Sequence, residues 1–130
     1  MKVCIVGCGA IGSLFAAHLA RLKDVEVWAY EVNQAHVDAI NAGGLRLSGF
    51  KQLHSHPKAS ADAARIPACD FGIVATKSQH TRAAMAATAA VFRNAAVCSV
   101  QNGVGNEEII AEFAPRVMRG RWADSDRACS

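Results

Sequence analysis

The stretch that decides the fold is K-V-C-I-V-G-C-G-A-I-G, residues 2–12. Its first part, Lys2–Val6, is apolar and rich in β-branched residues, which predicts a buried strand. The three glycines that follow fit the pattern G-x-G-x-x-G, and an Ala- and Leu-rich segment over residues 10–22 predicts a helix. A strand, a glycine turn and a helix in this order are typical of the βαβ unit that binds a dinucleotide.

Each glycine of this turn has its own expected role. Gly7 would permit the tight turn, Gly9 would let a pyrophosphate approach the backbone, and Gly12 would allow the helix to pack closely on the strand. The N–H groups at the start of the helix would then face the phosphate charge. The alternative is that the glycines serve packing alone. We predict that the turn binds the cofactor through Gly7, Cys8, Gly9, Ala10, Ile11 and Gly12.

An acidic residue stands where a dinucleotide-binding unit needs one. Glu31 lies 19 residues after Gly12 and directly follows the apolar segment V-E-V-W-A-Y, residues 25–30. Its carboxylate could accept hydrogen bonds from both ribose hydroxyls of NAD, and it would repel the 2′-phosphate of NADP. We therefore predict Glu31 as a cofactor-binding residue, and it favours NAD. The alternative is a solvated loop residue.

The rest of the chain alternates between apolar strands and helices. Further strands are expected at residues 25–30, 70–76 and 95–100, with a fifth beginning at 117–118. Helices are expected at residues 34–42, 59–66, 81–92 and 107–113, with Asn33 and Asn106 as N-caps of the first and last, and a short hairpin at 45–56. This order predicts an α/β fold with a doubly wound parallel sheet, a Rossmann-like domain. We assign residues 1–120 to the domain and 121–130 to an irregular tail.

The composition fits one globular domain and excludes several classes of protein. The 130 residues are 52% hydrophobic, and 26 of them are alanine, so the core must be filled by small and aliphatic side chains. A disordered chain is excluded, because it needs low hydrophobicity and high net charge. The formal net charge is only +3 and the basic residues are scattered, so no nucleic-acid partner is predicted.

Cysteine usage and the apolar N-terminal region point to a cytoplasmic protein. The five cysteines are odd in number, irregularly spaced and form no C-x-x-C, which argues against a disulfide framework or a zinc ribbon. Residues 3–20 carry no formal charge, but three glycines and His18 interrupt them, so we predict neither a signal peptide nor a membrane anchor. His54 and His56 lack a third nearby ligand, and no metal site is predicted. His36 and His80 are expected on helix surfaces.

Two polar residues directly follow predicted strands. Lys77 comes after D-F-G-I-V-A-T, residues 70–76, and Asn102 comes after A-A-V-C-S-V-Q, residues 95–101. Ligands of open α/β sheets bind outside the carboxyl ends of the strands. Lys77 could meet a phosphate or a carboxylate, and the amide of Asn102 could both donate and accept. We predict that both residues line a candidate active-site cleft. The alternatives are that Lys77 is only a surface charge and that Asn102 only forms a turn before glycine.

Four segments together resemble the N-terminal domain of ketopantoate reductase (2-dehydropantoate 2-reductase). They are G-C-G-A-I-G-S-L-F-A-A-H-L-A from residue 7, G-G-L-R-L from 43, V-A-T-K-S-Q from 74 and Q-N-G-V-G-N-E-E from 101. The resemblance implies that residues 7–12 bind the dinucleotide, that Lys77 contacts cofactor or substrate, and that Asn102 contacts both. It also implies reduction of a 2-keto acid, 2-dehydropantoate, to (R)-pantoate with NADPH, on the route to pantothenate.

The sequence departs from this family in two places. The family commonly has an arginine near the end of the second strand for the NADP 2′-phosphate, whereas this chain reads Trp28-Ala29-Tyr30-Glu31. NADP and NAD therefore both stay open. The family also has a helical C-terminal domain that supplies a catalytic lysine and a substrate-binding glutamate, and this chain ends before one. We expect a truncated, frameshifted or fragmentary chain with little or no reductase activity alone.

Two other interpretations compete with a reductase domain. The first is a non-catalytic, dinucleotide-sensing regulatory module, which would share the glycine turn and the acid but gives no reason for Lys77 or Q-N-G-V-G-N-E-E. The second is a defective remnant. The expected partners are a dinucleotide and, with a second domain, a 2-keto acid. A homo-oligomer is left open.

Overall fold

A six-stranded parallel sheet forms the centre of the molecule in the computed structural model, which describes residues 1–47, 53–101 and 105–119. The strand order is β5-β2-β1-β6-β7-β8, and every neighbouring pair runs parallel. The strands of this sheet are β1 (Lys2–Val6), β2 (Glu26–Tyr30), β5 (Lys58–Ser60), β6 (Phe71–Val74), β7 (Ala96–Ser99) and β8 (Arg116–Arg119). This arrangement confirms the predicted α/β fold with a doubly wound parallel sheet.

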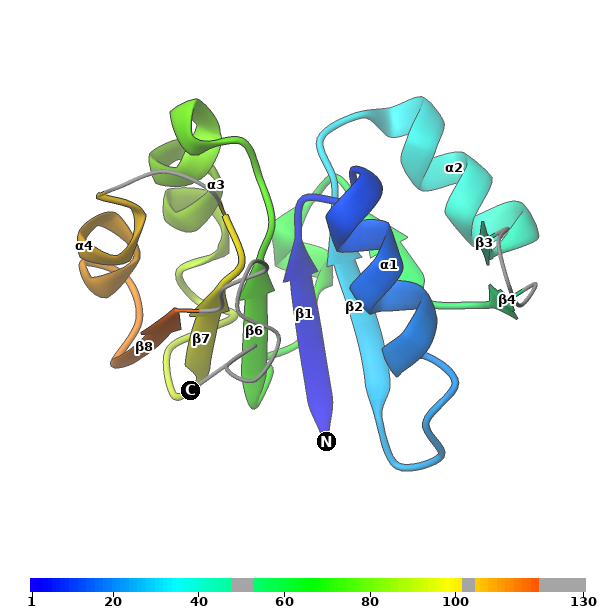
Figure 1. Ribbon diagram of the computed structural model, residues 1–130, viewed down its shortest axis with the longest axis horizontal. Helices are drawn as coiled ribbons and strands as arrows, with labels where there is room; N and C mark the ends of the chain where they lie inside the picture. Colours follow the sequence, from blue (N-terminus) through cyan, green and yellow to red (C-terminus); the bar gives the residue numbers. More distant parts are fainter. Residues whose placement is uncertain (48–52, 102–104, 120–130) are drawn as a thin grey trace.

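Helices cover both faces of the sheet (Figure 1). One face carries α1 (Ala10–Leu19) and α2 (Gln34–Gly43), whose residues share a hydrophobic cluster with β1 and β2. The other face carries α3 (Thr81–Thr88) and α4 (Asn106–Ala111), which share a second cluster with β1, β6 and β7. Successive residues of β1 alternate between the two clusters, as the pleat of a buried strand requires.

The order of the strands places a switch point between β1 and β6. From β1 the chain moves outward to β2 and β5, and it then crosses back to pair β6 with the other side of β1. Val3 to Val6 thus pair with β2 on one side and with residues 71–74 of β6 on the other. The loops after β1 and β6 leave the same edge of the sheet in opposite directions, which is where ligands bind in folds of this kind.

Alanines let the helices lie close to the sheet. Ala16 and Ala17 of α1 are fully buried, and Ala84 of α3 is nearly so. Because these positions carry only a methyl group, large side chains such as Met85 and Phe92 fill the remaining space on the second face. The high alanine content therefore belongs to the interface between helices and sheet.

A small antiparallel hairpin lies beside α1. It consists of β3 (Leu45–Leu47) and β4 (Leu53–Ser55), as predicted, and the buried Ser55 hydroxyl donates to the Ala17 carbonyl at 2.8 Å. The tail, residues 120–130, lies outside the described residues, and its predicted irregularity stays a prediction. Within the described parts of the chain, no helix has the length and apolar character needed to cross a membrane.

The helix predicted over residues 59–66 is wrong. The segment begins instead with strand β5, which pairs with β2 at the edge of the sheet, and it continues as a single 3₁₀ turn, η1 (Ala63–Arg65). The side chain of Asp62 accepts from the Ala64 N–H at 3.0 Å and starts this turn. Pairing with β2 outweighs the local helix propensity of the alanines.

The predicted N-cap of the last helix is also wrong. Gly105, with φ +89°, occupies the cap position, and Asn106 is the first residue of α4. The Asn106 side chain is buried and is engaged by other parts of the fold. By contrast, Asn33 caps α2 as predicted, because its side chain accepts from the His36 N–H at 3.2 Å.

Candidate functional site

The glycine turn has the backbone geometry that its sequence predicts. Gly7 has φ +89°, and its N–H donates to the Tyr30 carbonyl at 2.9 Å, so the turn begins in a conformation that side chains disfavour. A Cβ on Gly12 would collide with the Gly7 carbonyl oxygen, so Gly12 is needed for close approach of α1. Gly9 faces open space, where a Cβ would meet nothing within 4 Å.

The turn opens directly into α1. Gly9 is the N-cap of this helix and offers no side chain to the N–H groups of the first turn, and Ala10 begins the helix. The Cys8 thiol is buried, and burial raises its pKa. Any part that Cys8 has in ligand binding therefore involves its backbone and not its thiol. An exposed helix N-terminus without a side-chain cap is suited to an anion such as a pyrophosphate.

Glu31 lies beside the glycine turn. One carboxylate oxygen, Oε1, accepts from the Cys8 N–H at 2.9 Å, and Oε2 accepts from the Asn33 N–H at 3.0 Å. An ionised carboxylate has about four lone-pair sites, so about two remain for hydroxyl groups of a ligand. The structure thus brings Glu31 and the turn together, as the spacing in the sequence predicts.

A cavity of about 420 Å³ occupies this edge of the sheet. Gly7 and Gly9 lie on one side, Glu31 and the exposed Val32 on another, and Lys77 with His80 on the β6 side. A second cavity of about 350 Å³ adjoins it and is lined by Ile11 and residues 75–79 together with 100–101. Lys77 borders both cavities, so an elongated ligand could lie across the switch point with this lysine near its middle.

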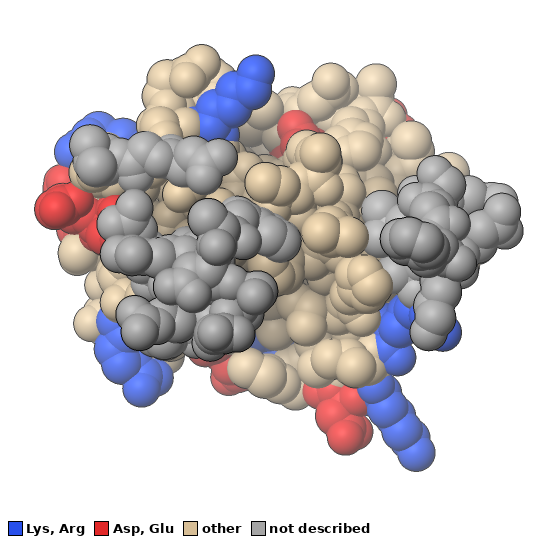
Figure 2. All heavy atoms as spheres, in the orientation of Figure 1, with Lys and Arg blue, Asp and Glu red and all other residues tan. Residues whose placement is uncertain are grey.

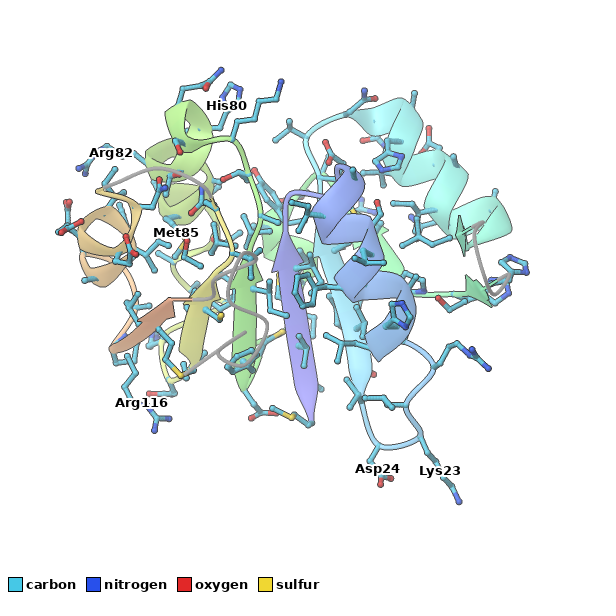
Figure 3. All side chains as sticks on the ribbon, in the orientation of Figure 1. Lys23, Asp24, His80, Arg82, Met85 and Arg116 are labelled. Atoms are coloured by element: carbon cyan, nitrogen blue, oxygen red, sulfur yellow. The ribbon has the colours of Figure 1, made fainter. Side chains whose placement is uncertain are left out.

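Figure 3 shows the position of one cavity-lining residue, His80. His80 lies at the edge of the sheet where β1 and β6 end, whereas Lys23, Asp24 and Arg116 lie at the opposite edge. On the face shown in Figure 2, lysines and arginines stand apart or beside acidic residues among the described part of the chain. Among the described residues that line the two cavities, the formally charged side chains are those of Glu31 and Lys77.

A buried polar network supports the second cavity. The Gln101 side-chain amide donates to the Thr76 carbonyl at 2.9 Å and to the Thr81 hydroxyl at 2.6 Å. The Thr81 hydroxyl in turn donates to Asn106 Oδ1 at 3.1 Å, and Asn106 Nδ2 donates to Ser78 Oγ at 3.2 Å. These bonds join the loop after β6, the end of β7 and the start of α4.

Sequence reasoning missed this network. From the sequence, Asn106 is interpreted as a helix cap, and Gln101 and Asn106 are both part of the segment Q-N-G-V-G-N-E-E that carries the family resemblance. The available signal was that both residues bracket the glycine-rich segment after a predicted strand, in Q-N-G-V-G-N. Asn102, a predicted cofactor and substrate residue, lies outside the described residues, so its role stays a prediction.

His36 also differs from its predicted role as a helix-surface residue. Its ring nitrogen Nε2 lies 2.7 Å from the Cys8 carbonyl oxygen, so the side chain reaches the glycine turn. His54 and His56 have ring centroids 4.6 Å apart, and His54 Nε2 lies 2.6 Å from the Gly43 carbonyl oxygen, which ties the hairpin to the end of α2.

A larger hollow lies elsewhere, between α2 and the edge strand β5. Its volume is about 800 Å³, and its lining includes Trp28, Lys58 and Arg65. It contains none of the glycine-turn residues and lies away from the switch point, so it is not the candidate cofactor site. Around it, Lys58 lies over the Trp28 ring and 3.6 Å from Glu26.

An open parallel sheet with this strand order, and with a glycine turn at its switch point, defines a dinucleotide-binding domain of the Rossmann class. Within that class, the chain belongs to the family described as ketopantoate reductase PanE/ApbA, which matches residues 3–122. The match corresponds to the N-terminal, NAD(P)-binding domain of these oxidoreductases. The family binds a dinucleotide cofactor and a keto acid substrate.

Curated relatives with similar sequences include 2-dehydropantoate 2-reductases. The 2-dehydropantoate 2-reductases of Pyrococcus abyssi and Pyrococcus horikoshii are each 38% identical to this chain in alignments of 123 residues that cover 92% of it. The same alignments cover 39% of each relative, so the chain spans about two fifths of their length.

Solved structures show the same fold. A PanE/ApbA family ketopantoate reductase from Ralstonia eutropha JMP134 is 34% identical with a TM-score of 0.82, covering 92% of this chain and 40% of that one. A ternary structure of D-mandelate dehydrogenase with NADH and anilino(oxo)acetate is 25% identical with a TM-score of 0.82, covering 93% and 40%.

Proposed function

We propose that this chain is the cofactor-binding part of an oxidoreductase that reduces the ketone of 2-dehydropantoate or a related 2-keto acid to a hydroxy acid. The observation that carries this is the pair of adjoining cavities at the switch point, with the glycine turn on one side and Lys77 between them. The family membership and the 2-dehydropantoate 2-reductases among its relatives support the reaction class.

The residues around the cavities fit a dinucleotide. The open space in front of Gly9 and the uncapped first turn of α1 suit the pyrophosphate, and Glu31 has lone pairs left for the ribose hydroxyls. When bound, the reduced nicotinamide supplies a hydride for the carbonyl carbon of the substrate. The chain's own residues bind and orient: Lys77 would attract a phosphate or carboxylate, and Asn102 would hold cofactor and substrate by its amide.

The protonation of the product alkoxide needs a general acid. Among the described residues that line the two cavities, the titratable side chains are those of Tyr30, which is buried, Glu31, and the exposed Lys77 and His80. We propose that the acid comes from another domain, as the family resemblance implies. The 130-residue chain would then bind dinucleotide and give little turnover of 2-dehydropantoate, which a stopped-time NADPH or NADH oxidation assay measures. Clear turnover would overturn this proposal.

We further propose that the site prefers NAD(H) to NADP(H). Glu31 stands at the ribose position, where a carboxylate repels a 2′-phosphate, and residues 28–31 hold no arginine. A D-mandelate dehydrogenase with a similar structure was solved with NADH and anilino(oxo)acetate, which supports NADH as a cofactor for this fold.

Titration with NADH and with NADPH, followed by cofactor fluorescence or calorimetry, tests this proposal. We expect NADH to bind at least about tenfold more tightly, a difference of about 1.4 kcal/mol. Tight NADPH binding with weak NADH binding would contradict the role given to Glu31. Failure to bind either dinucleotide would contradict the proposed function itself.

A further inference from the structure

A histidine outside the cavity reaches the glycine turn from α2. His36 Nε2 lies 2.7 Å from the Cys8 carbonyl oxygen, across 28 residues of sequence. A carbonyl oxygen can only accept a hydrogen bond, so Nε2 must carry the proton in this contact. His36 is half-buried, and it is not among the residues that line either cavity of the candidate site.

Both backbone groups of Cys8 are bound by side chains. The carbonyl accepts from His36 and also from the Ser13 hydroxyl at 2.9 Å, while the N–H donates to Glu31 at 2.9 Å. Cys8 therefore has its backbone direction set by three side chains from α1, the β2–α2 turn and α2. A carbonyl in a surface turn can be hydrogen-bonded by water alone. Two side-chain donors on the Cys8 carbonyl therefore fix its direction beyond what its hydrogen bonding requires.

The direction of the Cys8 carbonyl determines the direction of the next N–H group. The Cys8–Gly9 peptide bond is trans and planar, so the Gly9 N–H points opposite to the Cys8 carbonyl. With the carbonyl held on His36 and Ser13, the Gly9 N–H points away from both. A rotation of this peptide would instead present a carbonyl oxygen to a bound phosphate, and two partial negative charges would repel each other.

His36 is itself fixed by the turn that carries Glu31. The Glu31 carboxylate accepts from the Asn33 N–H at 3.0 Å, and the Asn33 side chain accepts from the His36 N–H at 3.2 Å. The ribose-binding position and the histidine are thus parts of one hydrogen-bonded segment, residues 31–36. The glycine turn is held between this segment and the first turn of α1.

We propose that His36 is a positioning residue for dinucleotide binding, which holds the Cys8–Gly9 peptide so that its N–H, and not a carbonyl oxygen, is offered to the pyrophosphate. This inference rests on the proposed dinucleotide-binding function. His36 lines neither cavity, so its effect on the cofactor passes entirely through the backbone of the glycine turn.

The test compares three substitutions of His36 in the 130-residue chain by NADH and NADPH titration at a temperature where all variants are folded. His36→Ala removes the donor and should raise the dissociation constant about five- to tenfold, the effect of one lost hydrogen bond to a positioned group. His36→Gln places an amide N–H near the original Nε2 position and should return the constant to within about twofold of the original. His36→Asn has the same amide on a shorter side chain and should behave like the alanine variant.

Gln34→Ala is the matched control on the same helix, because Gln34 bonds Asp38 and contacts the hollow beside β5 and not the glycine turn. It should bind dinucleotide as the unmodified chain does. The Gly9 amide resonance, followed by NMR without ligand, should move in the Ala and Asn variants and stay in place in the Gln variant.

The outcomes separate the inference from the function on which it rests. If the unmodified chain binds neither dinucleotide, the proposed function fails and the role of His36 fails with it. If the unmodified chain binds and His36→Ala binds equally well, the proposed function stands and only the role of His36 is overturned. Equal weakening by Ala, Asn and Gln would also overturn it, because that pattern indicates packing of the ring and not its N–H.

Discussion

Gly9 and Gly12 lie in the same turn, and an added methyl group would have different consequences at the two positions. At Gly12 a Cβ would collide with the Gly7 carbonyl oxygen, so α1 would have to move away from the sheet. At Gly9 a Cβ meets nothing within 4 Å, and the φ of −74° is one that alanine adopts. We expect Gly12→Ala to lower the free energy of unfolding by about 3 kcal/mol, the upper range for overpacking.

Gly9→Ala should instead keep the stability within about 1 kcal/mol, the cost of replacing a glycine by alanine at an N-cap. Its methyl group would stand in the space proposed for the pyrophosphate, so NADH affinity should fall at least about tenfold. Urea unfolding and NADH titration of the two variants measure both effects. Unchanged NADH binding by Gly9→Ala would show that the pyrophosphate does not approach this glycine.

The Thr81 hydroxyl connects two side-chain amides in the interior. It accepts from Gln101 Nε2 at 2.6 Å and donates to Asn106 Oδ1 at 3.1 Å, and the residue is fully buried. Thr81→Val keeps the shape and removes both hydrogen bonds, so it should lower the free energy of unfolding by about 1–3 kcal/mol. Thr81→Ser, which keeps the hydroxyl, should lose less, and chemical denaturation of both variants tests the difference. Equal losses would assign the effect to the methyl group.

The backbone part of the candidate site could be predicted from the sequence, and the side-chain network could not. Glycines at fixed spacing after a strand report a local conformation, and Glu31 follows from the length of one βαβ unit. Gln101, Thr81 and Asn106 meet across 20 and 25 residues, and only the packed fold brings them together. The contact of His36 with Cys8 is likewise non-local and carries no pattern in the sequence.

At the scale of elements, the edge strand β5 is protected by a side chain. Asn41 on α2 donates to the Ala59 carbonyl at 2.9 Å and accepts from the Ala59 N–H at 2.9 Å, in place of a further strand. We expect Asn41→Ala to lower the free energy of unfolding by about 1–2 kcal/mol and to increase self-association through the freed edge. Unfolding curves and light scattering measure the two effects.

Asp38→Ala is a suitable control for this edge, because Asp38 lies on the same helix and lines the same hollow without bonding the strand. It should leave the light scattering unchanged. Equal self-association of the two variants would assign the effect to the helix surface and not to the edge of β5.

The same strand explains the main error in the predicted elements. Residues 59–66 contain four alanines, which favour a helix locally, and only three residues form β5. Its pairing with Trp28, Ala29 and Tyr30 depends on where β2 lies, which local propensity does not report. The other strands and the main helices were predicted in the right places because their pattern extends over more residues, although the helix predicted over residues 81–92 ends at Thr88.

An exposed ion pair joins α3 to the end of α4. Arg82 donates to both carboxylate oxygens of Glu112, at 2.8 and 2.9 Å, and this hydrogen bonding lowers the pKa of Glu112 from its ordinary value of 4.5. A lowered folded-state pKa means that the carboxylate stabilises the fold above pH 4.5, and this contribution is lost as the pH falls through the folded-state value. The side chains are half exposed, so the effect should be small and weaker in salt.

Glu112→Gln tests this pair. Its melting temperature should lie below that of the unmodified chain at pH 7 and low salt, and the gap should close as the pH falls below 4.5 and through the lowered folded-state pKa. Differential scanning fluorimetry across pH measures the gap, with Glu108→Gln as an exposed control from the same helix. A gap that is constant with pH would show that the charge of Glu112 has no part in it.

At the scale of the whole molecule, the candidate site lies where the two halves of the sheet meet. One half is β5-β2-β1 with α1 and α2, and the other is β6-β7-β8 with α3 and α4. Glu31 belongs to the first half and Lys77 to the second, and both line the same cavity. A dinucleotide bound there would contact both halves at once, so its binding energy would oppose the unfolding of either.

We therefore expect NADH to stabilise the whole domain. At a free concentration one hundred times its dissociation constant, a ligand that binds only the folded state adds about 2.7 kcal/mol. For a chain of this length, that corresponds to a rise in melting temperature of about 10 °C. Amide hydrogen exchange should slow both in the turn after β2 and in the loop after β6, since one ligand would contact both. A tenfold weaker Gly9→Ala variant at the same NADH concentration should keep only about half of this stabilisation, about 1.4 kcal/mol. Protection confined to one half would mean that the ligand does not span the switch point.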